Sequence, residues 1–260
     1  MKAILFDLDG VLYVGDRPVE GAAQTVDWCR QAAISHLFVT NTTSKPRAAI
    51  AAKLTDMGIP VSEQEILTPP VAAVQWLQEN QLQRLSLFVS DITKQEFSAF
   101  TLIENEQQET DAVIVGDMGE AWDFMTLNRA FRFLMQPQSP QLLALGLTRY
   151  WRAEDGLRLD AGAYVSALQY ASGRAPVVLG KPASAFYNAA LHRLGIEPEQ
   201  AVMVGDDIKG DIEGAQCAGM QGILVRTGKF QESDLKQGIQ PSALIDSVAD
   251  LPAWWESSAS

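Results

Sequence analysis

The amino-acid sequence predicts an α/β protein whose core is a doubly wound, Rossmann-like parallel sheet. Short apolar runs rich in β-prone residues alternate along the chain with longer segments of helical period. This alternation is typical of a parallel sheet covered by helices on both faces. Polar residues follow several of the apolar runs directly. Because ligands bind at the carboxyl ends of the strands in open sheets of this kind, these polar clusters are expected to form one site.

The first predicted strand is the apolar run over residues 3–6, which is followed by Asp7, Asp9 and Gly10. Residues two positions apart on an extended chain point to the same side, so the two carboxylates can face one point. Two anions at that separation repel each other, and the pKa of one rises unless a cation lies between them. The end of this strand therefore indicates a cation site.

The later elements continue the alternation. Helices are expected over residues 19–33, 45–57, 71–79, 124–135, 164–171 and 183–194. Strands are expected over residues 35–41, 85–89, 112–115, 142–145, 201–204 and 222–225. Near the C-terminus, Trp254 and Trp255 are expected to pack against the core.

Polar clusters at predicted strand ends also define the expected domains. Besides Asp7 and Asp9, the clusters are Thr40 with Asn41, Lys181, and Asp206 with Asp207. Residues 76–176 hold no such cluster, so they are expected to form an inserted second domain. The expected division is a first part of the core over residues 1–75, an inserted α/β domain over residues 76–176, and a second part of the core over residues 177–260.

Composition restricts the class of protein. Of the 260 residues, 47% are hydrophobic and 20% are charged, and the formal net charge is −12. An acidic chain is a poor partner for nucleic acid or for an anionic membrane surface. There is no signal-peptide pattern and no apolar run of about 18 residues. The two cysteines, Cys29 and Cys217, have no metal-type spacing, so reduced thiols in a cytoplasmic protein are expected.

The carboxylates favour a hard cation, and Mg²⁺ is the expected cofactor because it takes one or two carboxylates plus waters and substrate phosphate. The only histidines, His36 and His192, are distant in sequence from the clusters, which disfavours zinc or iron. Phosphoryl transfer requires charge neutralisation, an in-line nucleophile and a proton donor for the leaving oxygen. Asp7 is the candidate nucleophile and Asp9 the candidate acid and base.

The remaining clusters supply candidates for the other roles. Mg²⁺ between Asp7, Asp206 and the backbone carbonyl of Asp9 would screen the repulsion between the nucleophile and the phosphate. Thr40 and Asn41 offer donors for the phosphate oxygens. Lys181, just before a predicted helix, adds a cation.

Four segments in this order resemble the motifs of the haloacid dehalogenase (HAD) superfamily. They are Asp7-Leu8-Asp9-Gly10-Val11, Val39-Thr40-Asn41, Gly180-Lys181-Pro182 and Gly205-Asp206-Asp207-Ile208-Lys209-Gly210-Asp211. The insert resembles a type IIA cap domain. Within the superfamily the chain is similar to the phospholysine phosphohistidine inorganic pyrophosphate phosphatases, through segments 10–13, 154–157, 205–211 and 225–230.

The resemblance implies further site residues. Thr42 would contact the phosphate together with Thr40, Asn41 and Lys181, and Asp207 and Asp211 would act from outside the metal's inner ligands. The insert would close over the site as a cap, and a loop over residues 160–164 would contact the leaving group. Relatives pair through their caps, which implies a possible homodimer.

The expected function is a Mg²⁺-dependent phosphatase of small phosphorylated metabolites that acts through an aspartyl-phosphate. Mammalian members of the similar phosphatase group have a residue other than aspartate at the position of Asp9. The aspartate in this chain favours phosphomonoesters as substrates. Four alternatives stay open: a phospholysine, phosphohistidine or pyrophosphate phosphatase, a dehalogenase, a phosphotransferase acting on sugars, and a non-catalytic module that binds phospho-ligands.

Overall fold

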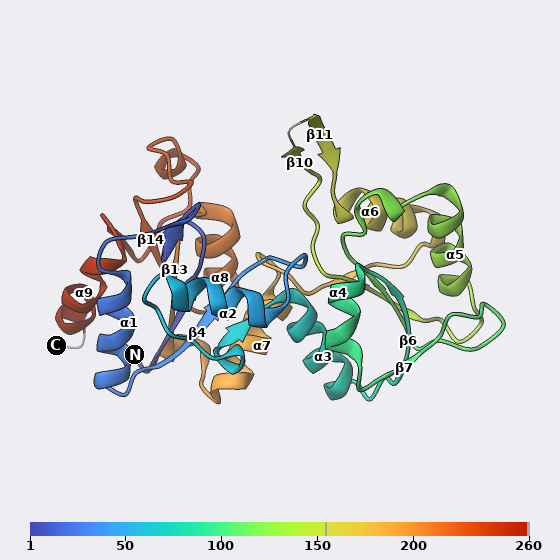
Figure 1. The fold of residues 1–260 in the computed structure, drawn as a ribbon, viewed down its shortest axis with the longest axis horizontal. Coiled ribbons are helices and arrows are strands. Elements are labelled where there is room, and N and C mark those ends of the chain that lie inside the picture. Colours follow the sequence, from blue (N-terminus) through green and yellow to red (C-terminus); the bar gives the residue numbers. More distant parts are fainter. Residues whose placement is uncertain (154, 259–260) are drawn as a thin grey trace. The chain divides into compact units, whose positions relative to one another are not determined.

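The computed structural model describes residues 1–153 and 155–258, and it divides into two compact units (Figure 1). The first unit comprises Met1–Thr40, Arg47–Leu67 and Lys181–Ser260, and the second comprises Asn41–Pro46 and Thr68–Gly180. Of the sequence segments that carry the family resemblance, Glu154 lies outside the described residues.

The boundaries expected at residues 76 and 176 both lie inside the second unit. Helix α3 (Pro69–Glu79) starts before the first boundary, with prolines at its first two positions, where a missing N–H does no harm. Strand β12 (Val177–Val178) lies after the second boundary, and it pairs with strand β9 (Gln141–Ala144) of the second unit.

The first unit is built on a six-stranded sheet in the order β15-β14-β13-β1-β4-β5, in which every neighbouring pair is parallel. Its strands are β1 (Ala3–Asp7), β4 (Ser35–Val39), β5 (Ile66–Leu67), β13 (Ala201–Gly205), β14 (Gln221–Val225) and β15 (Ala243–Ile245). Strand β1 lies between β13 and β4, so the polar residues after these three strands share one edge of the sheet.

Helices cover this sheet as the alternation predicts. They are α1 (Ala22–Gln31), α2 (Arg47–Asp56), α7 (Ser184–Leu194), α8 (Gly214–Cys217) and α9 (Leu251–Ser258). Ile4 and Phe6 of β1 pack in one apolar cluster with residues of α1, α2 and α9. The rings of Trp28 and Trp255 meet edge to face at 6.2 Å, which confirms that the C-terminal tryptophans pack against the core.

The second unit holds a five-stranded parallel sheet in the order β12-β9-β8-β6-β7. The strands not yet given are β6 (Arg84–Phe88), β7 (Thr101–Leu102) and β8 (Ala112–Val115). Helices α3, α4 (Asp91–Lys94), α5 (Phe124–Leu134) and α6 (Ala161–Ser172) accompany the sheet, drawn in green and yellow in Figure 1. A buried apolar cluster, which includes Phe88, Val113, Phe133 and Leu168, forms the core of this unit.

Predicted elements agree with observed ones to within three residues at either end. One expectation was wrong: residues 161–164 form the first turn of α6 and are not a loop. The reason is local, because the carboxylate of Asp160 accepts a hydrogen bond from the amide of Ala161 at 2.6 Å and caps the helix there.

The hairpin of β10 (Tyr150–Ala153) and β11 (Gly156–Leu159) was not predicted. Most of its residues are exposed, so it lacks the one-sided burial that makes strands visible in a sequence. Both cysteines are unpaired, with Cys29 buried and Cys217 exposed. Within the described residues, no helix has the length and apolar character needed to cross a bilayer.

Candidate active site

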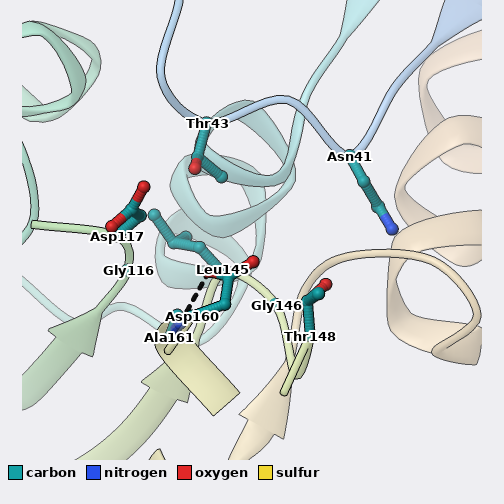
Figure 2. Close-up of a pocket in the computed structure, with 9 residues that line it drawn as sticks. All are labelled: Asn41, Thr43, Gly116, Asp117, Leu145, Gly146, Thr148, Asp160 and Ala161. Atoms are coloured by element: carbon teal, nitrogen blue, oxygen red, sulfur yellow. Dashed lines mark hydrogen bonds between the residues drawn. The ribbon is translucent and has the colours of Figure 1, made fainter. Parts of the chain in front are cut away.

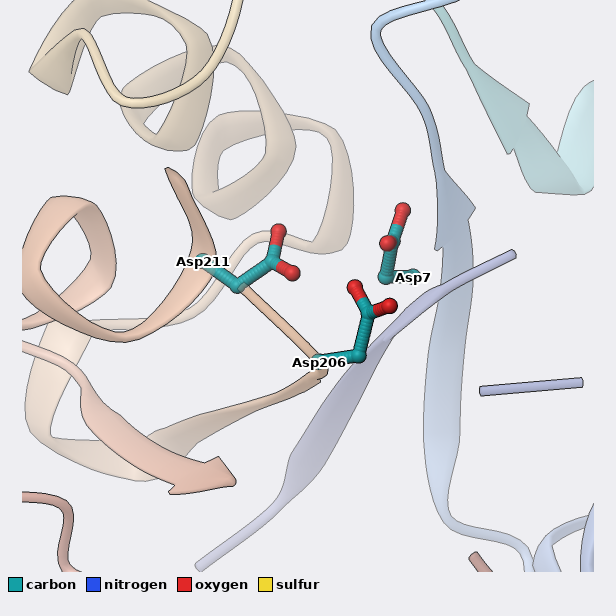
Figure 3. Close-up of side chains that lie close together, drawn as sticks. All are labelled: Asp7, Asp206 and Asp211. Atoms are coloured by element: carbon teal, nitrogen blue, oxygen red, sulfur yellow. The ribbon is translucent and has the colours of Figure 1, made fainter. Parts of the chain in front are cut away.

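Two carboxylates stand at the carboxyl ends of neighbouring strands. Asp7 is the last residue of β1, and Asp206 follows β13 directly. Asp211 lies on the π-helical turn η5 (Ile208–Glu213) that comes next in the chain. One carboxylate oxygen from each of these residues lies within 4.8 Å of the others, and all three residues are buried (Figure 3). We call this group the aspartate cluster.

The ammonium of Lys181 lies between two members of the aspartate cluster. Its Nζ donates to Oδ1 of Asp7 at 2.7 Å and to Oδ1 of Asp211 at 2.6 Å. Burial alone lowers the pKa of this amine, but the charges of Asp211 and Asp7 outweigh burial and hold the pKa above its ordinary value. Lys181 is therefore a permanent cation within the cluster.

The aspartate cluster and Lys181 together nevertheless carry an excess of negative charge. Three ionised carboxylates and one ammonium carry a net charge of −2. Burial raises the pKa of Asp206 to about 6, and burial together with the charge of Asp7 raises the pKa of Asp211 to about 6. Burial also raises the pKa of Asp7, and the charge of Asp206 adds to this. A divalent cation would restore neutrality.

Asp206 also has one oxygen that can serve as a metal ligand. Its Oδ2 accepts a hydrogen bond from the amide of Lys229 at 2.7 Å, whereas its Oδ1 is buried and has no hydrogen-bond partner among the described residues. A buried acceptor without a donor is destabilising. Hard cations prefer carboxylate oxygens, so the aspartate cluster fits a hard divalent cation and could hold one.

The two remaining acidic residues of the motifs have different surroundings. Asp9 lies two residues beyond Asp7, the last residue of β1, and is exposed. Its carboxyl is therefore accessible for proton transfer. Asp207 accepts hydrogen bonds from the amides of Lys209 and Gly210 at 3.0 and 2.8 Å and caps η5. The amide of Asp207 in turn donates to Oδ2 of Asp211 at 3.2 Å. Asp207 thus shapes the turn that carries Asp211.

The candidate phosphate-binding residues divide between the two units. Thr40 follows β4 directly and is buried, and its amide donates to the carbonyl of Leu67 at 3.1 Å. Because β4 neighbours β1, Thr40 lies at the same edge of the sheet as Asp7. Asn41 and Thr42 group with the second unit.

The structure also brings residues to the cluster that sequence reasoning missed. The hydroxyl of Tyr187, on α7, donates to the carbonyl of Gly210 at 2.7 Å, which ties this helix to η5. Burial and the charge of Asp211 hold the pKa of Tyr187 well above its ordinary value. The second missed residue is Lys229, which acts through its backbone amide. No residue type encodes a backbone donor, although the glycine at 228 after a predicted strand indicates a turn there.

The second unit has a cavity of its own, of about 50 Å³. It lies at the carboxyl ends of β8 and β9 and at the start of α6, and the segment after β4 also lines it (Figure 2). Its lining residues are Asn41, Thr43, Gly116, Asp117, Leu145, Gly146, Thr148, Asp160 and Ala161. Burial raises the pKa of Asp160, and the charge of Asp117 adds to this. The cavity is therefore acidic, and its volume is sufficient for a water molecule or one polar head group.

Known proteins are similar to this chain in both sequence and fold. The sequence profile of haloacid dehalogenase-like hydrolases matches residues 4–102, and a second profile described as HAD-hydrolase-like matches residues 178–251. The phospholysine phosphohistidine inorganic pyrophosphate phosphatase of Homo sapiens is 36% identical over 255 residues, covering 96% of this chain and 92% of that protein. The chain belongs to the haloacid dehalogenase-like hydrolase family. The family resemblance inferred from the four motifs is thereby confirmed.

Solved structures also agree with this family assignment. A hypothetical protein from Pyrococcus horikoshii has a TM-score of 0.88 and 26% identity, and the match covers 98% of this chain and 100% of that chain. A variant of the thermostable p-nitrophenylphosphatase from Bacillus stearothermophilus has a TM-score of 0.84 and 25% identity, with 96% and 97% of the two chains covered. The predicted HAD fold, a Rossmann-like core with an inserted α/β cap domain, is confirmed.

Proposed function

We propose that this haloacid dehalogenase-like hydrolase is a Mg²⁺-dependent phosphatase that hydrolyses small phosphorylated metabolites through an aspartyl-phosphate on Asp7. The observation that carries the proposal is the aspartate cluster with Lys181 at the carboxyl edge of the sheet, where Asp7 is fixed by a 2.7 Å bond to the ammonium. The names of the human relative and of the Bacillus enzyme, both phosphatases, support this class of reaction.

In the first step, a carboxylate oxygen of Asp7 attacks phosphorus, and the bond from phosphorus to the leaving oxygen breaks. Asp9 donates the proton that the leaving oxygen takes up. In the second step, Asp9 accepts a proton from water, the water oxygen attacks phosphorus, and the bond to Asp7 breaks. This releases inorganic phosphate and regenerates both carboxyl groups. The exposure of Asp9 suits a group that must reach both the substrate and water.

Other residues support these steps through charge and position. Mg²⁺ held by Asp7, Asp206 and the carbonyl of Asp9 would lower the repulsion between nucleophile and phosphate. Lys181 keeps the carboxylate of Asp7 oriented and adds a positive charge for the phosphate. We assign phosphate contacts to Thr40 and, from the segment after it, Asn41 and Thr42.

Two residues would act on the cluster from further out. We assign Asp211 the role of holding Lys181, because their atoms are 2.6 Å apart. Asp207 would stabilise the turn that carries Asp211.

The decisive experiment is Asp7→Asn, assayed with p-nitrophenyl phosphate and Mg²⁺. Asparagine keeps the shape but is a poor nucleophile, so activity should fall by about 10³-fold or more. Asp56→Asn is the matched control, since Asp56 is an exposed residue at the end of α2, and it should retain parental activity. Turnover by Asp7→Asn at the parental rate would show that the nucleophile is another group.

We propose that the second unit acts as a cap and that the leaving group contacts the start of α6. The support is the cavity lined by Asp117 and Asp160 and by Asn41 of the proposed phosphate-binding segment. Its two carboxylates favour leaving groups that carry a positive charge or hydroxyl donors. Asp160→Asn should therefore change the ranking of substrates in a panel of phosphate esters, with little effect on p-nitrophenyl phosphate. An unchanged ranking would exclude Asp160 from substrate selection.

The same panel tests the second candidate activity. The human relative is named for phospholysine, phosphohistidine and pyrophosphate, so these compounds belong beside phosphosugars, phosphoglycolate, pyridoxal phosphate and nucleotides. We expect phosphomonoesters to be preferred, because a proton donor such as Asp9 accelerates departure of an alkoxide most. Preference for the phosphoramidates or for pyrophosphate would favour the second activity.

We also propose a cytoplasmic homodimer that pairs through the second unit. The hairpin β10–β11 exposes large apolar side chains, with Tyr150 51%, Trp151 44%, Leu157 62% and Leu159 62% exposed. Tyr150, Leu157 and Leu159 lie on one face of the hairpin, and an exposed apolar patch of this kind marks an interaction surface. The unpaired Cys29 and Cys217 suit a reducing compartment. Light scattering should show a dimer for the parent and a monomer for Leu157→Ser, and a monomeric parent would contradict the pairing.

A further inference from the structure

The segment that follows β14 contacts Asp206 of the aspartate cluster and the loop after β1. The hydroxyl of Thr227 donates to the backbone carbonyl of Gly10, in the loop after β1. The amide of Lys229 donates to Oδ2 of Asp206 at 2.7 Å. We propose that residues 227–229, which we call the clamp, form a positioning element that fixes the Asp206 carboxylate for metal binding. The inference rests on the proposed metal site, and it adds an element outside the four sequence motifs.

The hydrogen bond from the clamp distinguishes the two oxygens of Asp206. A carboxylate can rotate about its last single bond and exchange its oxygens, and it must stop rotating when a metal binds. Because the amide of Lys229 holds Oδ2, the buried and unpartnered Oδ1 is left as the ligand atom. Partners that orient a metal ligand in this way raise metal affinity, and their loss lowers it about 10–100-fold.

Two glycines also enclose the Asp206 carboxylate. Gly228 of the clamp has φ +68°, and a Cβ added there would lie 2.1 Å from Oδ2 of Asp206 and 2.4 Å from Cα of Gly10. Gly10 has φ +93°, and a Cβ added to it would lie 2.0 Å from the same Oδ2. Both contacts are far below van der Waals distance, so any side chain at either position must displace the carboxylate. The absence of a side chain at residue 228 is therefore a property of the site and not only of the turn.

Thr227 connects the clamp to the loop after β1. Its hydroxyl holds the carbonyl of Gly10, and Gly10 borders the carboxylate of Asp206. The loop after β1 also contains Asp9, whose carbonyl is the proposed third ligand of Mg²⁺. Loss of the hydroxyl would therefore loosen two proposed metal ligands, the carbonyl of Asp9 and the carboxylate of Asp206.

The test is a titration of the full-length protein with Mn²⁺ alone, in which electron paramagnetic resonance measures the free ion. Mn²⁺ prefers the same oxygen ligands as Mg²⁺. Thr227→Val and Gly228→Ala should each weaken Mn²⁺ binding about 10–100-fold. Thr227→Ser keeps the hydroxyl and should bind within about threefold of the parent. The metal affinity is measured without substrate, so a general loss of catalysis does not affect the result.

Matched controls separate positioning from general damage. Thr55→Val removes an exposed threonine hydroxyl that donates to the carbonyl of Ala51 at 2.8 Å. Gly58→Ala places a side chain at φ +79°, where no atom lies within 4 Å of the added Cβ. Both controls carry the chemical change of the test variants away from the clamp, and both should bind Mn²⁺ as the parent does.

Any of four results would overturn the inference. If Thr227→Val and Gly228→Ala bind Mn²⁺ as tightly as the parent, the clamp does not position Asp206, while the proposed metal site stands. If Gly58→Ala weakens binding as much as Gly228→Ala, backbone strain alone explains the effect. If the parent binds no Mn²⁺, or if Asp206→Asn binds it unchanged, the metal site of the proposed function fails and the clamp inference fails with it. Should Gly228→Ala not fold, the comparison of Thr227→Val with Thr227→Ser decides.

Discussion

Replacing Lys181 with methionine removes a buried cation and leaves its anionic partners in place. The Lys181 side chain is 5% exposed, and its Nζ lies 2.7 Å from Asp7 and 2.6 Å from Asp211. Methionine fills a similar volume, so the change is mainly one of charge. Removing one partner of a buried ion pair costs about 3–5 kcal/mol, because the remaining charge is uncompensated. We expect Lys181→Met to lower the free energy of unfolding by about that amount at neutral pH without divalent metal.

Urea unfolding followed by tryptophan fluorescence measures this loss. With an m-value of about 1–3 kcal/mol per molar urea, a loss of about 3–5 kcal/mol should lower the midpoint by roughly 1–5 M. Lys236→Met is the matched control, because Lys236 is exposed, and surface substitutions usually change stability by less than about 0.5 kcal/mol. An unchanged midpoint for Lys181→Met would refute the view that this ammonium balances the carboxylates.

The pH dependence of the loss provides a second check on the same variant. Removing the cation raises the folded-state pKa of Asp7 and Asp211 further above the unfolded value. A carboxyl whose folded-state pKa is raised destabilises the protein when pH exceeds the unfolded value, and the penalty disappears as the group is protonated. The deficit of Lys181→Met should therefore shrink as pH falls from neutral towards about 6, because the variant's carboxyls take up protons above the pH at which parental Asp211, with a pKa of about 6, does so. A deficit that is constant with pH would contradict this explanation.

Two other predictions follow from the aspartate cluster and from Asp9. Millimolar Mg²⁺ should raise the Tm of the parent, and the increase should grow as pH rises through about 6, because Asp206 must lose its proton to bind metal and has a pKa of about 6. An increase that is the same on both sides of this pH would argue against Asp206 as a metal ligand. Asp9→Asn should lower kcat/KM by about 10²–10⁴-fold for alkyl phosphates. The loss should be much smaller for p-nitrophenyl phosphate, because its leaving group departs without a proton. Equal losses for both substrates would show that Asp9 does not protonate the leaving group.

The features that the sequence predicted well are those with a local pattern. A buried strand followed at once by a carboxylate is visible in the residues themselves, and this pattern predicts that Asp7 and Asp206 stand at strand ends, as they do. The alternation with helices predicts that the strands run parallel, but it does not determine their order in the sheet. The same reasoning failed for residues 161–164, where Asp160 caps a helix that begins earlier than its apolar period indicates.

Contacts that depend on backbone geometry were not predictable. Asp211, which contacts Lys181 at 2.6 Å, lies on the π-helical turn η5, and π-helical turns are rare. The donor to Asp206 is a main-chain amide, which every residue except proline possesses. The exposed hairpin β10–β11 was missed because exposed apolar residues such as Trp151 do not follow the burial alternation of a half-buried strand.

The division of the chain has a consequence for how such enzymes can change. Asp7, Lys181, Asp206 and Asp211 all belong to the first unit, and the acidic cavity lies entirely in the second. The reacting groups therefore do not depend on the inserted sequence for their mutual contacts. An exchange of residues 68–180 for the corresponding segment of a relative would keep the proposed chemistry and replace the surface proposed to choose its substrate. Under the proposed roles, reactivity and selectivity lie on separate segments of the chain that can diversify independently of each other.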